Sequence, residues 1–188
     1  YGMSKATMER MFCGLDGKTP TKFLCVRYGN VTWSTGSVLP IWKKMHEETG
    51  VLKSTGPEMT RFFFTIEDAV QLVITSLQQA ENFRGRVLSR EMKAAKVQDI
   101  LDTWVDTKGG RWERMEGRPG DRPYECLIGE QELDYTRELK IDGVLHYLIS
   151  FNERVATPLT SVVSSDSAPR LSKSEISALI NAVPPEAL

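Results

Sequence analysis

Residues 22–40 have the sequence KFLCVRYGNVTWSTGSVLP, and this stretch decides the fold class. Residues 22–28 are short, apolar and bounded by turn signals, which is typical of a buried strand. Residues 29–37 are rich in Gly, Ser and Thr and predict a loop. Residues 38–48 predict a helix with Pro40 in its first turn, where proline is tolerated. A strand, a loop and a helix in this order indicate an α/β fold.

The same alternation of helices and short strands continues along the chain. The pattern predicts further helices at residues 1–12, after Thr65 and at 97–108, strands at 51–54, 86–89 and 111–115, and a hairpin at 139–149 around Asp142-Gly143. The helix after Thr65 is expected to bury one apolar stripe, made of Val70, Val73, Ile74 and Leu77. Phe62, Phe63 and Phe64 are expected to pack within a strand.

The two ends of the chain differ in their signals. Residues 1–12 carry a helical stripe of Met8, Met11 and Phe12, without an N-cap or a lead-in segment. We therefore expect the chain to begin inside a helix, as a fragment of a longer protein; a chain that starts at Tyr1 is the alternative. Residues 157–169 predict an exposed tether. Ser172 and Glu175 then have the spacing of a capping box, with Leu171 and Ile176 as its hydrophobic staple.

Composition excludes several classes of protein. Apolar residues make up 40% of the chain and charged residues 26%, with a net charge of −1. These values exclude a disordered chain, a collagen-like chain and a strongly basic nucleic-acid binder. No apolar run approaches the roughly 20 residues of a membrane span, and no signal peptide is evident. Three dispersed cysteines and two isolated histidines predict free thiols in a reducing cytoplasm and no metal site.

Tyr1 and Lys5 are four residues apart, so on a helix they share one face. A neighbouring ammonium favours the phenolate and lowers the pKa of a tyrosine, which can then exchange a proton with a carbonyl or hydroxyl group. The pair is a candidate catalytic pair. By itself the pattern more often marks a solvated surface pair, because this spacing is common in helices.

Four further motifs follow in order: RYGNV (residues 27–31), STGSVLP (34–40), MTRFFFTIEDAV (59–70) and RPGDRPYE (118–125). With Tyr1 and Lys5, they resemble the extended short-chain dehydrogenase/reductase superfamily, and within it the inverting UDP-N-acetylglucosamine 4,6-dehydratases of polysaccharide biosynthesis. The resemblance implies the carboxyl-terminal part of a Rossmann-type, doubly wound parallel sheet with a small mixed α/β region. Residues 1–90 would finish the NAD(P)-binding domain, 91–156 would bind substrate, and 157–188 would form the tether and terminal helix.

The resemblance also implies roles for single residues. Tyr1 and Lys5 would be catalytic and contact the nicotinamide ribose of NADP or NAD, and Val31 would lie against the nicotinamide. The residues expected to contact a UDP-sugar are Asn30, Thr35, Gly36, Ser37, Val38, Leu39, Arg61, Arg118 and Glu125. Helix N-terminal amides and guanidinium groups suit a diphosphate. Without the resemblance, Asn30 fits a turn, and Arg61 and Arg118 fit solvated loop charges.

The chain departs from this family in three ways. Thr35 stands where family members usually carry an arginine, which leaves the substrate preference open. Trp33 is unusual and is expected to narrow the pocket. A Gly-rich dinucleotide fingerprint is absent from the sequence, as are the acid and lysine that precede the tyrosine in the family. This chain alone is therefore expected to be inactive.

The full-length protein is accordingly expected to be a cytoplasmic, self-associating lyase that acts on UDP-N-acetylglucosamine for bacterial-type surface polysaccharide. The resemblance implies oxidation at C4 of the sugar, loss of water across C5 and C6, and return of hydride to C6. Two alternatives remain. One is a nucleotide-sugar 4-epimerase or reductase of the same superfamily, and the other is a degenerate, non-catalytic sugar-nucleotide binding module.

Overall fold

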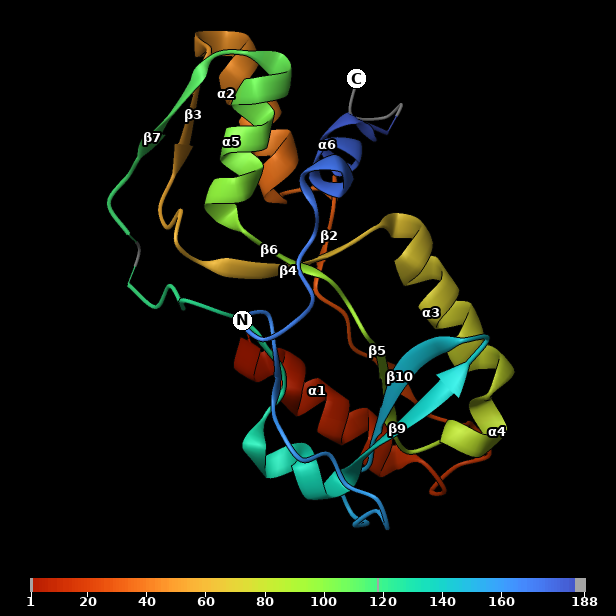
Figure 1. Cartoon of the computed structure of the whole chain (residues 1–188). Coiled ribbons are helices and arrows are strands. Elements are labelled where there is room, and N and C mark those ends of the chain that lie inside the picture. The colour runs from red at the N-terminus through yellow and green to blue at the C-terminus, as the bar shows by residue number, and fades with distance from the viewer. Residues whose placement is uncertain (1, 118, 185–188) are drawn as a thin grey trace. The chain divides into compact units, whose positions relative to one another are not determined.

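The computed structural model describes residues 2–117 and 119–184 and divides into two compact units (Figure 1). Unit 1 consists of residues 1–28, 67–91 and 127–163, and unit 2 of residues 29–66, 92–126 and 164–188. The segments of the two units therefore alternate along the chain. The consecutive segments expected from the sequence, with boundaries after residues 90 and 156, stay a prediction. No helix within the described ranges is long and apolar enough to cross a lipid bilayer.

Unit 1 contains a four-stranded sheet with the strand order β1-β5-β10-β9. Strand β1 pairs in parallel with β5, and β10 pairs antiparallel with both β5 and β9. The helices and strands of this unit are α1 (Gly2–Leu15), β1 (Cys25–Val26), α3 (Ile66–Gln78), α4 (Ala80–Phe83), β5 (Val87–Arg90), the 3-10 helix η1 (Glu130–Tyr135), β9 (Thr136–Ile141) and β10 (Val144–Ile149). The apolar residues of β5 and β10 form the centre of its core.

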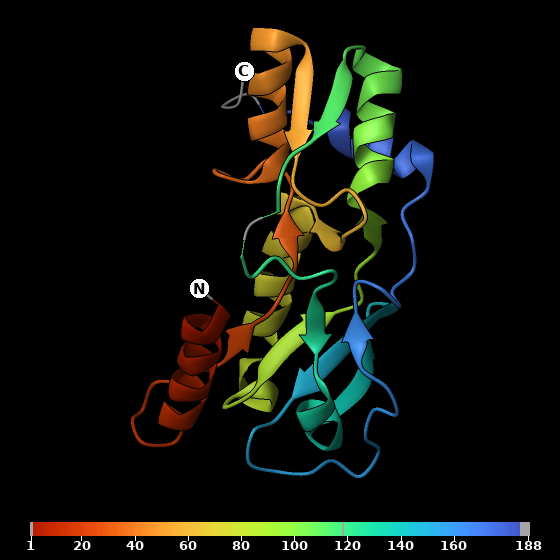
Figure 2. The same ribbon diagram turned by 90° about the vertical axis from the view of Figure 1, so that its left-hand side faces the viewer.

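Unit 2 contains a three-stranded sheet, β2-β4-β6, and the parallel pair β3-β7. Figure 2 shows β3 and β7 side by side, next to α2 and α5. The elements are β2 (Asn30–Val31), α2 (Val38–Thr49), β3 (Val51–Ser54), β4 (Thr60–Phe64), β6 (Ala94–Lys96), α5 (Val97–Lys108), β7 (Arg111–Arg114) and α6 (Lys173–Asn181). Helices α2, α5 and α6 enclose a core of large aromatic and aliphatic side chains. Strands β8 (Cys126–Ile128) and β11 (Val163–Ser164) lie where the chain passes from one unit to the other.

Local signals predicted several elements correctly. The hairpin turns at Asp142 and Gly143, whose φ angles are 51° and 79°, as a type I′ turn requires. The capping box at the start of α6 is present, because the Ser172 side chain accepts from the Glu175 amide and the Glu175 side chain accepts from the Ser172 amide. The three phenylalanines of β4 are buried, which confirms that they pack within the strand.

The predicted apolar stripes of two helices are not buried. In α3 the large residues Val70, Val73, Ile74 and Leu77 are exposed, and the helix buries the smaller face that carries Ala69, Leu72, Thr75 and Ser76. In α1 the stripe of Met8, Met11 and Phe12 is also exposed. Periodicity identifies an apolar face but does not say which neighbour covers it, so the burial predicted for the α3 stripe was wrong. The helix predicted at the start of the chain is present as α1.

Two further expectations need correction. The strand expected over residues 22–28 is limited to Cys25–Val26, since only these residues pair with β5. The tether expected at residues 157–169 is not uniformly exposed, because Ser164 and Ser165 are buried. The Ser165 hydroxyl donates to the Thr60 carbonyl over 2.9 Å, so the part of this segment that belongs to unit 2 is held by hydrogen bonding within that unit.

A nearly buried ionic cluster in unit 1 is centred on Arg27, which follows β1. Its Nε and Nη2 donate to the Glu9 carboxylate of α1, and Nη1 and Nη2 donate to the Glu132 carboxylate of η1 over 3.0 Å. Nη1 also donates to the Leu127 carbonyl over 2.7 Å. Burial opposes ionisation of Glu132, but the hydrogen bond and charge of Arg27 outweigh it and lower the pKa of Glu132. The cluster fixes α1, β1 and η1 to one another.

Replacing Arg27 by Met should destabilise the chain by about 3 kcal/mol, because two largely buried carboxylates lose their shared counter-charge. Urea unfolding of the whole chain measures this loss. Arg154→Met is the matched control: Arg154 pairs with Asp134 over 3.5 Å, but both side chains are more than half exposed. The control should change the free energy of unfolding by less than about 1 kcal/mol. Equal losses in the two variants would contradict the role given to the Arg27 cluster.

The capping box makes the stability of α6 dependent on pH. Donation from the Lys93 ammonium over 2.6 Å, together with the Ser172 amide and hydroxyl, lowers the pKa of Glu175 to about 2. A carboxyl group with a lowered pKa stabilises the fold above its unfolded pKa and loses that effect as the pH falls through the folded value. The urea midpoints of the wild type and Glu175→Gln should therefore differ most near pH 6 and converge towards about pH 2. A difference that stays constant with pH would contradict this assignment.

Candidate functional site

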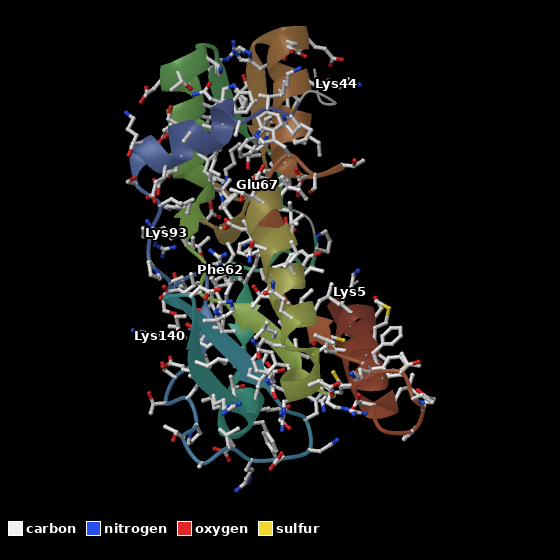
Figure 3. The ribbon with its side chains drawn as sticks, turned by 90° about the vertical axis from the view of Figure 1, so that its right-hand side faces the viewer. Lys5, Lys44, Phe62, Glu67, Lys93 and Lys140 are labelled. Atoms are coloured by element: carbon white, nitrogen blue, oxygen red, sulfur yellow. The ribbon has the colours of Figure 1, made fainter. Side chains whose placement is uncertain are left out.

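The candidate site begins where the chain leaves Gly29 and enters β2 beside β4. Asn30 pairs with Phe63 in parallel register, and a Cβ atom on Gly29 would lie 2.4 Å from the Phe62 Cβ. A side chain at position 29 would therefore push β2 away from β4. Figure 3 labels Phe62 in this strand. Asn30 lies in a strand, so the turn that its sequence also allowed is not formed.

Asn30 is held in place by Glu125. Its amide nitrogen Nδ2 donates to both carboxylate oxygens of Glu125, over 2.9 and 3.0 Å, and to the Phe62 carbonyl over 3.1 Å. The same carboxylate accepts from the Phe62 amide over 2.9 Å. Because Nδ2 is directed towards these acceptors, the amide oxygen Oδ1 is directed away from Glu125, where it can accept a hydrogen bond from a ligand.

A cavity of about 280 Å³ lies beside β2, entirely within unit 2. The predicted site residues that line it are Asn30, Val31, Gly36, Ser37, Val38, Leu39 and Arg61. They come from β2, from the start of α2 and from β4, three segments that are separate in sequence. The structure therefore brings together most of the substrate residues that the sequence predicted.

The N-terminus of α2 forms one wall of this cavity. Ser37 is its N-cap residue and makes no side-chain capping bond, and Val38 and Leu39 are the first helical residues. The Ser37 hydroxyl oxygen is buried and has no hydrogen-bond partner within the described ranges. A helix of 12 residues presents unpaired amides and a partial positive charge at this end. The wall therefore suits a negatively charged oxygen.

Arg61 contributes charge but has little free hydrogen-bonding capacity. Its Nη1 donates to the Thr60 carbonyl over 2.8 Å, and Nη2 donates to the Arg122 carbonyl over 2.9 Å. Its Nε lies 3.8 Å from the Glu125 carboxylate. The guanidinium is thus held at the cavity by backbone carbonyls, and the solvated loop charge that the sequence also allowed is not what the structure shows.

Among the remaining predicted residues, Lys5, Thr35 and Glu125 do not line the cavity. Tyr1 and Arg118 fall outside the described residues. Lys5 is exposed on α1 in unit 1, as Figure 3 shows. Thr35 is exposed and does not line the cavity, and Glu125 acts behind Asn30. Trp33 is buried in the core of unit 2 instead of narrowing the cavity, because its indole packs among α5 and α6 residues.

Several lining residues were not predicted. The cavity is also lined by Thr32, Trp42, Ser54, Thr55, Gly56, Met59, Phe63, Val97, Ile100 and Asp121. Most are apolar or neutral residues whose sequence pattern signals only packing. Met59, Phe63 and Asp121 lie within the quoted motifs, and this was the one available signal for them. The part of the chain that the structure describes holds no group of three or more His, Cys, Asp or Glu residues suited to a metal ion.

Comparison with known proteins gives a consistent picture. A family model described as polysaccharide biosynthesis protein matches residues 1–144. UDP-glucose 4-epimerase from Rickettsia conorii is 30% identical over 95% of this chain and 56% of the relative. The inverting UDP-N-acetylglucosamine 4,6-dehydratase from Campylobacter jejuni is 27% identical over 74% of this chain and 42% of the relative.

A solved structure shows the same fold. The X-ray structure of Pen from Bacillus thuringiensis has a TM-score of 0.83 and 27% identity, over 96% of this chain and 56% of that one. With the three parallel strand pairs, this likeness confirms the expected α/β class, the carboxyl-terminal part of a Rossmann-type fold. The chain spans about half the length of the curated relatives it matches, or less.

Ser37 and Ser165, two serines of unit 2, should respond oppositely to removal of the hydroxyl group. Ser37→Ala should leave the free energy of unfolding unchanged or slightly raised, because its hydroxyl has no partner among the described residues. Ser165→Ala should cost about 1–3 kcal/mol, since its oxygen bonds Thr60 and accepts from the Glu125 amide over 2.9 Å. Urea unfolding of both variants measures the contrast. A large loss in Ser37→Ala would show that its hydroxyl is already used within the protein.

Proposed function

The chain belongs to the polysaccharide biosynthesis protein family of the extended short-chain dehydrogenase/reductase superfamily, and on this premise we propose that the unit 2 cavity binds the diphosphate of a UDP-sugar. The observation that carries the proposal is Ser37, the N-cap residue of α2, which lines the cavity and whose hydroxyl has no hydrogen-bond partner among the described residues. Val38 and Leu39 would donate backbone amides to a phosphate oxygen. Arg61 would add positive charge, and Asn30 would accept from a hydroxyl or amide group through Oδ1.

For the whole protein, we propose a nucleotide-sugar 4,6-dehydratase that acts on UDP-N-acetylglucosamine in surface polysaccharide biosynthesis. The ordered motifs and the Campylobacter jejuni relative support this reaction. The Rickettsia conorii relative, similar over nearly the whole chain, supports 4-epimerisation as the second candidate. We further propose that the whole protein is cytoplasmic and self-associates.

A nicotinamide cofactor, NADP or NAD, would supply reversible hydride acceptance to this protein. The described residues fit part of such a group. Half-buried Val31 of unit 2 offers an apolar surface at the cavity wall. In this proposal Tyr1 holds or releases a proton at the sugar C4 oxygen, and Lys5 favours its ionised form. The roles proposed for Tyr1 at the cofactor and for Arg118 at the substrate rest on the family resemblance.

Calorimetric titration of the whole chain with UDP tests the cavity. UDP should bind, and uridine should bind more weakly because it lacks the diphosphate. Ser37→Ala should weaken UDP binding by about tenfold, the expected loss of one hydrogen bond to a charged group. Thr35→Ala is the matched control, because Thr35 is exposed two residues away and does not line the cavity. Equal affinity for UDP and uridine would contradict diphosphate binding here.

The reaction is tested with the full-length protein loaded with its cofactor. A 4-keto-6-deoxy product from UDP-N-acetylglucosamine, detected by mass spectrometry as loss of one water, is the expected result. A 4-epimer of unchanged mass would favour the second candidate. If well-folded protein binds UDP but forms neither product, the enzyme proposal fails and the binding-module alternative takes its place.

A further inference from the structure

Trp33 has a backbone conformation that an aromatic residue rarely adopts. Its φ angle is 61°, and within the described ranges Asp142 is the other non-glycine residue with a positive φ. Asp142 occupies a tight hairpin turn that requires this conformation, whereas Trp33 lies in the loop between β2 and α2. The left-handed region is sterically unfavourable for an L-residue, so surrounding contacts must hold Trp33 there.

Those contacts come from the C-terminal helix α6. The indole Nε1 of Trp33 donates to the Leu179 carbonyl over 2.8 Å. Leu179 lies in the last turn of α6, where backbone carbonyls have no partner within the helix. The Trp33 ring is buried beside Trp104, with ring centroids 6.4 Å apart, and within the cluster that contains Ile176. The side chain of Trp33 thus joins the loop to α6.

Helix α6 is itself firmly attached to unit 2. Its capping residue Glu175 pairs with Lys93 over 2.6 Å, and Lys173 pairs with Asp106 of α5 over 2.6 Å. Figure 1 shows α6 beside α5 and α2. These ion pairs hold the first turn of α6, and the core of unit 2 buries Ile176 and Ile180 of the same helix. Helix α6 therefore provides a fixed reference for the loop that carries Trp33.

The same loop forms the cavity wall. Thr32 before Trp33 and Gly36 to Leu39 after it line the cavity, while Trp33 is directed into the core. On the near side, the Thr32 amide donates to the Phe64 carbonyl over 2.8 Å, and this fixes the loop to β4. On the far side, the Ser37 amide donates to the Ser34 carbonyl over 2.9 Å. Between these points the Ser34 hydroxyl donates to the Val31 carbonyl over 2.8 Å, and Trp33 joins this part of the loop to the core.

We propose that Trp33 is a positioning residue, which uses α6 as its support to place the N-terminus of α2 in the cavity wall. It touches no ligand itself. The consequence for affinity rests on the proposed function, since it requires the cavity to bind a diphosphate. By this inference α6 determines the ligand affinity of a cavity that it does not line.

Trp33→Phe is the test variant, because it removes the indole N–H and keeps an aromatic ring. Trp112→Phe is the matched control: Trp112 also lies in unit 2 and donates Nε1 to the Asp102 carboxylate over 2.7 Å, but it does not line the cavity or join the loop. Amide hydrogen exchange of residues 34–39 should be about tenfold faster in Trp33→Phe than in the wild type, and unchanged in Trp112→Phe. Unchanged exchange of this segment in Trp33→Phe would overturn the positioning role.

Titration with UDP separates this inference from the proposed function. UDP should bind about fivefold more weakly to Trp33→Phe, the effect of about 1 kcal/mol of lost preorganisation, and equally to Trp112→Phe and the wild type. If wild-type protein does not bind UDP, the proposed function fails and hydrogen exchange alone decides the positioning role. If UDP binds wild type and Trp33→Phe equally, the link from Trp33 to ligand affinity is wrong.

Discussion

The close approach of β2 to β4 is the constraint on which the candidate site depends. Position 29 lacks a side chain, so the chain can pass the Phe62 Cβ at a distance that no Cβ atom would allow. This approach aligns Asn30 with Phe63 and places its amide on the Glu125 carboxylate. The loop that follows then starts from a fixed point and leads into α2. Gly29 thus permits the strand pairing, and the hydrogen bonds of Asn30 and the position of the cavity wall follow from it.

Within each unit, buried polar contacts specify the positions of the helices and strands more closely than buried apolar surface does. In unit 1, Arg27 joins a helix, a strand and a 3-10 helix through two carboxylates. In unit 2, Ser165 links β4 to Glu125 from a segment with little apolar character. Such groups are costly to bury unless every partner is present, so they specify one arrangement of the elements around them. The exposed apolar faces of α1 and α3 carry no comparable specification.

Part of the candidate site could be predicted from sequence, but the separate role of each residue could not. The motifs around Asn30 and the start of α2 named six of the residues that line the cavity, and the motif at residues 59–70 named a seventh, Arg61. Thr35 and Glu125 were assigned the same role, yet one is exposed outside the lining and the other orients Asn30. A motif names neighbours along the chain, while a cavity depends on which side of each residue faces inward. The apolar lining was missed because its residues have the same pattern as ordinary core.

The sequence by itself determined the helices, the hairpin turn at Asp142-Gly143, the capping box at Ser172 and the family, because these depend on local spacing and on residue types in order. Only the tertiary structure decided which helix faces are covered, that residues near Ser165 are buried and that Trp33 turns into the core. The physical reason is that burial and hydrogen-bond partners come from segments far apart in the chain. The local periodicity of the sequence does not identify those partners.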